Sequence, residues 1–348
     1  MRSPPKCSVI IATLSGLDVL RTAIASVRMQ GFENIEILVV DDASSDRTTE
    51  WLAAKIAQDP RIVPVRTESR GASRRRNLAL SQARAPIVAF LDGGDFWWPG
   101  KLLRAVRFHE ANPAVAFTFT DFLNVGFHGE TLGTGFDFWR PNEVDRTIQD
   151  FKLLLDPEIE LLAINVVDIS TVVASRKALE AANGFPAAGL SAQNWRLWLD
   201  LAAEYLVAYT PATTTTHRAR PASVAEDPGA QIKTMREIID PYRTRTEWRV
   251  RRAVRQAAAR IDTAEAEYAR ALGDNFGAAT AHLRALARWP QWRTARAAAA
   301  DFRATLRGAA SQADDFLVRS AHKISMGHSA SDRCSRNGVS ALRQEGTL

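Results

Sequence analysis

Short, uninterrupted apolar runs recur through the first part of the chain, and amphipathic segments separate them. Such runs, bounded by polar residues, are typical of strands that are buried on both faces of a sheet. The segments between them place apolar residues at helical spacing, as at Leu17, Leu20 and Ile24. The pattern predicts strands over Cys7–Thr13, Ile35–Val40, Arg61–Val65 and Ile87–Leu91, and helices over Leu17–Gln30, Thr48–Gln58, Gly71–Arg84 and Lys101–Asn112. Strands and helices that alternate with short connections imply an α/β fold with a doubly wound parallel sheet.

The pattern is less regular beyond residue 112. We expect a loop or hairpin over Gly126–Arg140 and a short strand or loop over Leu206–Pro211. Further strands are expected over Val115–Phe122 and Asp168–Ser175. Helices are expected over Glu143–Leu155, Arg176–Ala182 and Ser191–Tyr205. Asn183-Gly184 would form the C-cap of the second of these helices. In the third, Trp195, Leu197 and Trp198 would face the core.

The composition changes after Pro228. Gln231–Leu306 is rich in Ala and Arg at helical spacing, which predicts three to four helices packed on the core. From about His322 the chain is rich in Ser, Gly and Arg, and we expect it to be disordered. The expected organisation is a domain over residues 1–228, a helical region over 229–320 and a tail over 321–348.

The chain has 348 residues and a formal net charge of +6, which suits anionic partners without selecting one of them. Its only cysteines are Cys7 and Cys334, so neither a disulfide framework nor a cysteine-based zinc site is expected. Apolar segments all fall short of the roughly 20 residues that cross a membrane. We therefore expect a cytoplasmic protein, peripheral at most to the inner face of the membrane through its basic helices.

Polar clusters follow the predicted strands at four places, and one of them is Asp92-Gly93-Gly94-Asp95. The others are Thr13–Ser15, Asp41–Asp46 and the segment around Arg70–Asn77. Because the carboxyl ends of parallel strands meet at one edge of a sheet, these clusters would form a site for a phosphate-bearing ligand. Two carboxylates there can hold a hard cation. The alternatives are a polar turn for Asp92–Asp95, a helix N-cap at Asp46, and a solvated helix face for Arg74 and Arg75.

Two familiar phosphate-binding patterns are absent. No Gly-x-Gly-x-x-Gly follows the first strand, and no Gly-x-x-x-x-Gly-Lys-Ser/Thr occurs anywhere in the chain. The Arg-rich C-terminal region alone supports a nucleic-acid-binding alternative, and no base-reading motif accompanies it. We therefore expect no nucleic-acid partner.

Four motifs, SVIIAT, VVDDASSDRT, GASRRRNLAL and PIVAFLDGGDFWWPGKL, occur in this order across Lys6–Leu103. Together they resemble the nucleotide-sugar half of family 2 glycosyltransferases of the GT-A fold. The resemblance continues more weakly to about Ser223, through STVVASRKALEAANGF and Trp-x-Leu-Trp-Leu. It implies a GT-A-like, mainly parallel sheet, with the nucleotide-sugar half at 6–103, the acceptor half at 104–228 and a helical appendage.

The resemblance also implies roles for individual residues. Ala12, Thr13 and Leu14 match positions near the nucleoside, Asp42 matches the aspartate that contacts the base, and Arg76 matches an arginine beside the diphosphate. Asp92, Gly93 and Gly94 match the nucleotide-sugar loop, and Asp92 and Asp95 match carboxylates around a divalent metal, Mn²⁺ or Mg²⁺. The implied reaction is inverting transfer from a nucleotide sugar, most simply a UDP-sugar, to a glycan, lipid or protein acceptor.

The chain departs from the family pattern at three places: Leu14-Ser15 replaces Tyr-Asn, Gly94 replaces an acidic residue, and Gln193-Asn194 replaces Glu-Asp. The aspartate of that Glu-Asp pair is the usual catalytic base, and an amide such as that of Asn194 cannot accept the proton. Asp168 and Asp121 are candidate substitutes, each near an expected strand end. The alternative is a glycosyltransferase-like protein that binds nucleotide sugar or glycan without turnover. The segment from His217 to Ser223 resembles one that covers the diphosphate.

Overall fold

The computed structural model describes residues 3–12, 16–41, 48–67, 71–126, 128–139, 147, 149–186, 192–219 and 227–307. Its N-terminal part contains the strands β1 (Cys7–Ala12), β2 (Ile35–Asp41), β3 (Ile62–Arg66) and β4 (Ile87–Asp92). They lie in the order β3-β2-β1-β4, and neighbouring strands are parallel. β1 is buried along its whole length, as expected for a mainly apolar strand covered on both faces, and its buried Ser8 donates to Glu36 of β2. The four strands expected from the sequence are confirmed.

Helices cover both faces of these strands: α1 (Leu17–Arg28), α2 (Thr48–Gln58), α3 (Ala72–Gln82) and α4 (Lys101–Ala111). Successive residues of a strand point to opposite faces, so β1 divides its side chains between two cores. Val9 and Ile11 pack in the core that α1, α2 and α4 cover. Ile10 packs in the other core, with Ala79 and Leu80 of α3. The doubly wound arrangement is confirmed.

Further along the chain, the described residues extend the same sheet with the strands β5 (Phe96–Trp97), β6 (Val115–Val125), β7 (Thr131–Thr134), β8 (Lys152–Leu153), β9 (Val173–Ser175) and β10 (Leu206–Arg218). The full order is β3-β2-β1-β4-β9-β6-β10-β5, with β7 beside β6 and β8 beside β10. β6 and β10 are parallel, whereas β9 is antiparallel to both β4 and β6. The sheet is therefore mixed but mainly parallel, and β6 and β7 form the expected hairpin.

Two expectations for this part were wrong in the described residues. The expected strand Asp168–Ser175 is a strand only from Val173, because Ile169–Thr171 forms a 3-10 turn, η1, which the Asp168 side chain caps by accepting from Ser170 N. The expected helix Glu143–Leu155 contains the short strand β8, which pairs with β10. An exposed strand edge supplies backbone partners that helical spacing in the sequence does not reveal.

The described residues of this part also form the helices α5 (Gly135–Trp139), α6 (Pro157–Ala163), α7 (Arg176–Ala181) and α8 (Gln193–Glu204). The C-cap expected after α7 is confirmed, since Gly184 has a φ of 68° and its N–H donates to Leu179 O at 2.8 Å. The expected core face of α8 is confirmed as well, because Trp195 and Trp198 are buried.

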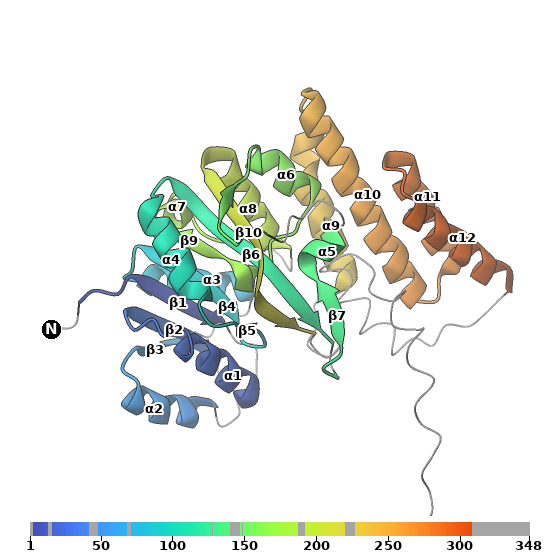
Figure 1. Cartoon of the computed structure of the whole chain (residues 1–348). Coiled ribbons are helices and arrows are strands. Elements are labelled where there is room, and N and C mark those ends of the chain that lie inside the picture. Colours follow the sequence, from blue (N-terminus) through green and yellow to red (C-terminus); the bar gives the residue numbers. More distant parts are fainter. Residues whose placement is uncertain are drawn as a thin grey trace, which may run out of the picture.

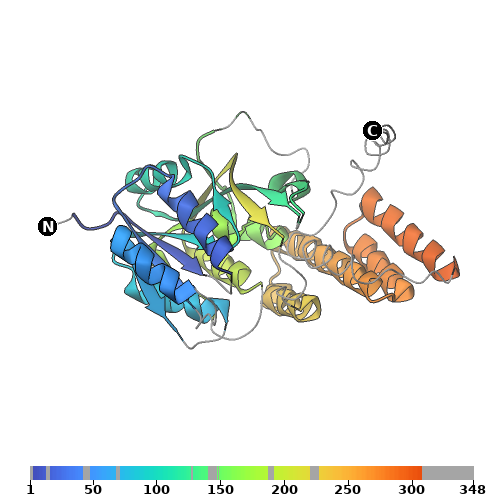
Figure 2. The same cartoon turned by 90° about the horizontal axis from the view of Figure 1, so that it is seen from below.

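The C-terminal region contains α9 (Pro228–Ile239), the 3-10 turn η2 (Asp240–Thr244), α10 (Trp248–Ala271), α11 (Asn275–Arg288) and α12 (Trp292–Arg307). α10 packs against α6 and α9, and α11 and α12 follow beyond it, so that the three helices project from the sheet domain (Figures 1 and 2). The three to four expected helices are confirmed, although in the described residues α11 packs mainly on α10, and α12 packs mainly on α11. None of the described helices combines the length and apolar character that crossing a membrane requires.

Candidate active site

Three of the sequence-predicted residues meet at the carboxyl edge of the sheet. Arg76 lies in the first turns of α3, Asp92 ends β4, and Asn194 lies at the start of α8. Arg76 Nη2 donates to Asp92 Oδ1 at 2.7 Å, and Arg76 Nη1 donates to Asn194 Oδ1 at 3.3 Å. The arginine side chain is only 7% exposed, and its guanidinium lies over the Phe185 ring. A planar guanidinium held in this way is suited to binding a phosphate group.

The backbone joins Asp92 to the tip of the neighbouring strand. Ala12 pairs with Asp92 across β1 and β4, and Gly93 N donates to Ala12 O at 3.0 Å. A Cβ atom added at Gly94 would meet nothing within 4 Å, so the backbone of this loop is open on that side. Thr13, Leu14 and Asp42, the other residues expected near the nucleoside, lie outside the described residues.

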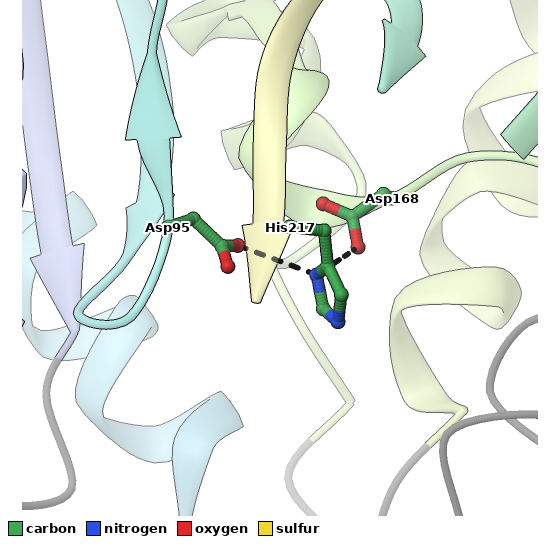
Figure 3. Close-up of side chains that lie close together, drawn as sticks. All are labelled: Asp95, Asp168 and His217. Atoms are coloured by element: carbon green, nitrogen blue, oxygen red, sulfur yellow. Dashed lines mark ion pairs between the residues drawn. The ribbon is translucent and has the colours of Figure 1, made fainter. Parts of the chain in front are cut away.

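A second group lies beside the first and consists of Asp95, Asp168 and His217 (Figure 3). His217, near the end of β10, places Nδ1 3.2 Å from Asp168 Oδ2 and 3.5 Å from Asp95 Oδ2. Burial alone would lower the pKa of His217, but the charges of Asp95 and Asp168 outweigh it and raise the pKa well above its usual value. The two carboxylates thus favour a positive charge between them.

Ser170 connects the two groups, and sequence reasoning did not identify it. Its hydroxyl donates to Asp95 Oδ2 at 2.5 Å and accepts from Asp92 N at 3.0 Å. Its own N–H donates to Asp168 Oδ1 at 2.8 Å. One fully buried serine therefore contacts all three aspartates of the edge. The only signal in the sequence was its closeness to Asp168, and the expected strand concealed the turn that brings the serine into place.

Two side chains from the Trp-Trp-Pro-Gly-Lys segment donate hydrogen bonds to backbone carbonyl groups of the η1 turn. Trp97 Nε1 donates to Ser170 O at 2.7 Å, and Lys101 Nζ donates to Thr171 O at 3.0 Å. Burial lowers the pKa of Lys101 to about 7. Trp97 and Lys101 are both buried, so they position the turn and do not face a ligand.

The second group fits a divalent cation. Its two carboxylates and one imidazole each offer a ligand atom, and these atoms all lie within 4.8 Å of one another. Oxygen ligands with one imidazole nitrogen suit a borderline-hard ion such as Mn²⁺. Of the two metal ligands expected from the sequence, Asp95 belongs to this group, whereas Asp92 is paired with Arg76 instead.

Two further expectations change with the structure. Arg75 does not lie on a solvated face: it is only 1% exposed, whereas Arg74 is exposed as expected. Asp121, a candidate substitute for the base, is fully buried, and its Oδ1 accepts from the backbone N–H groups of Phe122 and Phe136. Asp121 therefore supports the β6 end and is not available to an acceptor.

Comparison with known proteins identifies the family. Residues 8–157 match the model of glycosyl transferase family 2. The chain carries a family 2 glycosyltransferase domain. Among curated relatives, this chain is 33% identical over 116 residues to the Escherichia coli UDP-Glc:alpha-D-GlcNAc-diphosphoundecaprenol beta-1,3-glucosyltransferase WfaP. The aligned residues make up 33% of this chain and 45% of WfaP. The chain is 35% identical over 129 residues to the putative teichuronic acid biosynthesis glycosyltransferase TuaG of Bacillus subtilis, covering 37% of this chain and 51% of TuaG. The match thus spans about half the length of these two relatives.

Solved structures share the fold over most of the chain. TarS 1–349 of S. aureus, in complex with UDP, covers 93% of this chain and 92% of its own, with a TM-score of 0.57 and 18% identity. The mannosyltransferase PcManGT from Pyrobaculum calidifontis, in complex with GDP-Man and Mn²⁺, covers 92% of this chain and 87% of its own, with a TM-score of 0.55 and 18% identity. The GT-A-like fold expected from the sequence is confirmed.

Proposed function

We propose that this chain transfers a sugar from a nucleoside-diphosphate sugar to an acceptor hydroxyl, with inversion and with the help of a divalent cation. The observation that carries this proposal is the continuous connection from Asn194 and Arg76 through Asp92 and Ser170 to the Asp95–Asp168–His217 group. It combines a guanidinium suited to phosphate with a cation-binding group at the edge where open α/β sheets bind ligands.

The donor is proposed to lie across the tips of β1 and β4. Arg76 would bind the diphosphate, and the open backbone at Gly94 would approach the sugar closely. Ala12, Thr13, Leu14 and Asp42 would surround the nucleoside. A UDP-sugar is our first choice of donor, because a structural neighbour was solved with UDP and a curated relative is a UDP-Glc-dependent glucosyltransferase.

The cation, Mn²⁺ or Mg²⁺, is proposed to bind at Asp95, Asp168 and His217. When bound, it would neutralise charge that develops on the departing diphosphate. Ser170 would hold the carboxylates of Asp95 and Asp168 in position, since it forms a hydrogen bond with each of them. Arg218, next to His217, also takes part through its backbone N–H, which donates to Asp95 Oδ1 at 3.2 Å. Asp95 is thus held at both oxygens before any ligand arrives.

The proton acceptor is the least conventional part of the proposal. Asn194 stands at the position of the family base, and its amide accepts from Arg76. Asp168, a substitute base expected from the sequence, is assigned to the cation instead. A carboxylate that ligates a cation beside the departing diphosphate cannot also take the proton of an acceptor hydroxyl that attacks from the opposite side. The amide at Asn194 also favours a second candidate function, which is binding of nucleotide sugar or glycan without turnover.

The acceptor is proposed to be a glycan, and more specifically a lipid-linked glycan, because the curated relative WfaP is named for a diphosphoundecaprenol-linked acceptor. A panel of UDP- and GDP-sugars incubated with the chain and Mn²⁺ tests the proposed donor reaction. We expect donor hydrolysis or transfer with at least one UDP-sugar. Tight donor binding without any release of nucleoside diphosphate, with and without lipid-linked acceptors, would favour the binding function. Absence of both binding and turnover would contradict both functions.

A further inference from the structure

The positive charge of this chain is concentrated in its last three described helices. Residues 248–307 contain twelve arginines, no lysine and five acidic residues, which amounts to a formal charge of +7. The whole chain carries +6, so the remaining residues together are close to neutral. A local surplus of this size creates a positive field around the helices that favours an anionic partner.

The acidic residues of this region lie mainly inside the helical layer. Asp262 is fully buried and accepts from Arg236 and Arg288 at 2.9 and 2.7 Å. Asp301 is buried too, and it accepts from Arg270 and contacts His282. Because these carboxylates are directed inward, the outer surface of α10 and α12 is left dominated by arginine.

One end of the layer adds tryptophan to this charge. The start of α10, the end of α11 and the start of α12 lie at the same end, since consecutive helices run in opposite directions (Figure 1). The guanidinium of Arg252 in α10 lies 5.4 Å from the centre of the Trp289 ring, which follows α11. We name this region the tryptophan–arginine end and define it by Trp248, Trp289, Trp292, Arg251, Arg252 and Arg293.

Two of the three tryptophans of this end are unusually exposed. Trp248 is 69% and Trp292 is 67% exposed, although tryptophan normally lies mostly inside a folded protein. Arg251, Arg252 and Arg293 are exposed beside them. The described acidic residues close by are each paired with an arginine outside this set: Glu158 and Glu247 with Arg245, and Asp156 with Arg249. The charge offered to a partner is therefore positive.

We propose that the tryptophan–arginine end docks on the surface of a lipid bilayer that contains anionic headgroups. Indole rings with a polar N–H and an apolar body favour the boundary between headgroups and acyl chains, and arginines add attraction to lipid phosphates. The inference deepens the proposed function and rests on it in one respect, since a lipid-linked acceptor would be presented at such a surface.

Other occupants fit these observations less well. A second copy would bring +7 against +7, which repels. The segment 308–348 has five basic and four acidic residues, so it offers little charge to complement the helices. Nucleic acid would match the charge, but Trp248 and Trp292 lie on separate helices. Within the part of the chain that the structure describes, these helices carry no series of aromatic rings of the kind that binds single strands.

Sedimentation of the full chain with vesicles tests the inference. The probes are vesicles of phosphatidylcholine alone and vesicles with one part in three of phosphatidylglycerol, without nucleotide or donor. We expect binding to the anionic vesicles that is at least tenfold stronger than to the neutral ones and that weakens with added salt. Binding should fall at least tenfold in Trp248→Ser/Trp292→Ser and in Arg251→Gln/Arg252→Gln/Arg293→Gln.

Matched controls come from the same chain. Leu272 and Phe276 lie at the opposite end of the layer, are each 61% exposed, and should tolerate Leu272→Ser/Phe276→Ser without loss of vesicle binding. Lys177→Gln/Lys233→Gln/Arg107→Gln should bind vesicles like the wild type, because these exposed cations lie outside the three helices. Circular dichroism melts identify any variant that fails to fold. If the tryptophan variant fails to fold, the arginine variant alone tests the inference.

Several results would overturn the inference. Equal binding to neutral and anionic vesicles, no vesicle binding at all, or unchanged binding by both the tryptophan and arginine variants each contradicts it. Binding to a mixed-sequence single-stranded DNA but not to vesicles would assign the surface to nucleic acid. Self-association that the tryptophan variant abolishes, without vesicle binding, would assign it to a second copy. Vesicle binding requires no turnover, so a chain that binds vesicles but hydrolyses no donor contradicts only the proposed function.

Discussion

Ser170 is the residue on which the arrangement of the three aspartates depends most directly. It contacts the side chains of Asp95 and Asp168 and the backbone of Asp92. Because Ser170 is fully buried, we assign it a positioning role and no contact with substrate. Removing the hydroxyl would leave Asp92 N without this acceptor and would release Asp95 Oδ2 from its shortest hydrogen bond.

We therefore expect Ser170→Ala to weaken Mn²⁺-dependent binding of UDP by about tenfold, which corresponds to about 1.4 kcal/mol. Calorimetric titration with UDP in the presence and absence of Mn²⁺ measures the effect. The matched control is Ser175→Ala, which removes a helix-capping hydroxyl at the start of α7 and should lower stability alone. Equal affinities for Ser170→Ala and the wild type would argue against the positioning role.

Asn194 offers a change that should increase activity. In wild type, the amide oxygen of Asn194 accepts a hydrogen bond from Arg76. Asn194→Asp places a carboxylate at the same position. A carboxylate can take the proton of an acceptor hydroxyl, so we expect transfer to rise at least tenfold while donor affinity changes little. Turnover and donor binding are measured on the same preparation. A variant that binds donor as the wild type does and gains no turnover would show that Asn194 does not occupy the base position.

His109 should make stability sensitive to mild acid. It is buried behind β9, Nε2 lies 3.0 Å from Val173 O and 3.3 Å from the Thr118 hydroxyl, and burial lowers its pKa to about 4. Its usual value is 6.5, so the unfolded chain binds a proton first as the pH falls. The stability that neutral His109 contributes is complete above pH 6.5 and decreases towards pH 4.

In His109→Gln the amide can still donate to Val173 O but does not titrate. The difference in unfolding free energy between wild type and variant should therefore shift against the wild type by about 3 kcal/mol as the pH falls through this window. Urea titrations at several pH values measure it. A difference that stays constant with pH would contradict the neutral, buried state of His109.

At the scale of elements, the strength of the sequence pattern decided what could be predicted. The strands β1, β2 and β4 are mainly apolar, because parallel strands covered on both faces leave few positions for polar groups. The buried Glu36 of β2 is an exception, and it is paired with Ser8 and Arg84. β8 has two residues, both exposed, and exists only because the edge of β10 offers it backbone partners. β10 runs on through four consecutive threonines to Arg218, a stretch whose polarity concealed its place beside β6.

The packing of the C-terminal helices depends on a buried carboxylate that links three of them. Asp262 in α10 accepts from Arg236 in α9 and from Arg288 in α11. Helical spacing in the sequence predicted the helices but could not reveal this long-range contact. Removing one partner of a buried ion pair leaves the other charges poorly compensated.

We expect Asp262→Ala to destabilise the helical region by about 3 kcal/mol and to expose α11 and α12 to limited proteolysis before the sheet domain. Hydrogen exchange followed by mass spectrometry resolves the two regions. Asp240→Ala is the control, because Asp240 is exposed and its pair with Arg243 should contribute little. Unchanged protection of α11 in Asp262→Ala would contradict the role of this network.

At the scale of the whole molecule, the site is built from both halves of the chain. Arg76, Asp92 and Asp95 come from the N-terminal half, and the sequence motifs there predicted them. Asp168, Asn194 and His217 come from the second half, and only the antiparallel insertion of β9 and the long β10 bring them to the same edge. Motif spacing predicted the edge of the sheet, whereas the pairing of His217 with Asp95 depends on a tertiary contact over more than a hundred residues.

The central claim is that this edge binds a nucleoside diphosphate together with a divalent cation at Asp95. Calorimetric titration of the full chain with UDP, with and without Mn²⁺, tests it most directly, using wild type, Asp95→Ala and the nearly isosteric Asp95→Asn. We predict that Mn²⁺ strengthens UDP binding at least tenfold in the wild type and has no effect in either variant, while thermal melts show that at least one variant is folded. Equal UDP affinity with and without Mn²⁺ in the wild type, or an undiminished Mn²⁺ effect in a folded Asp95 variant, would contradict the claim.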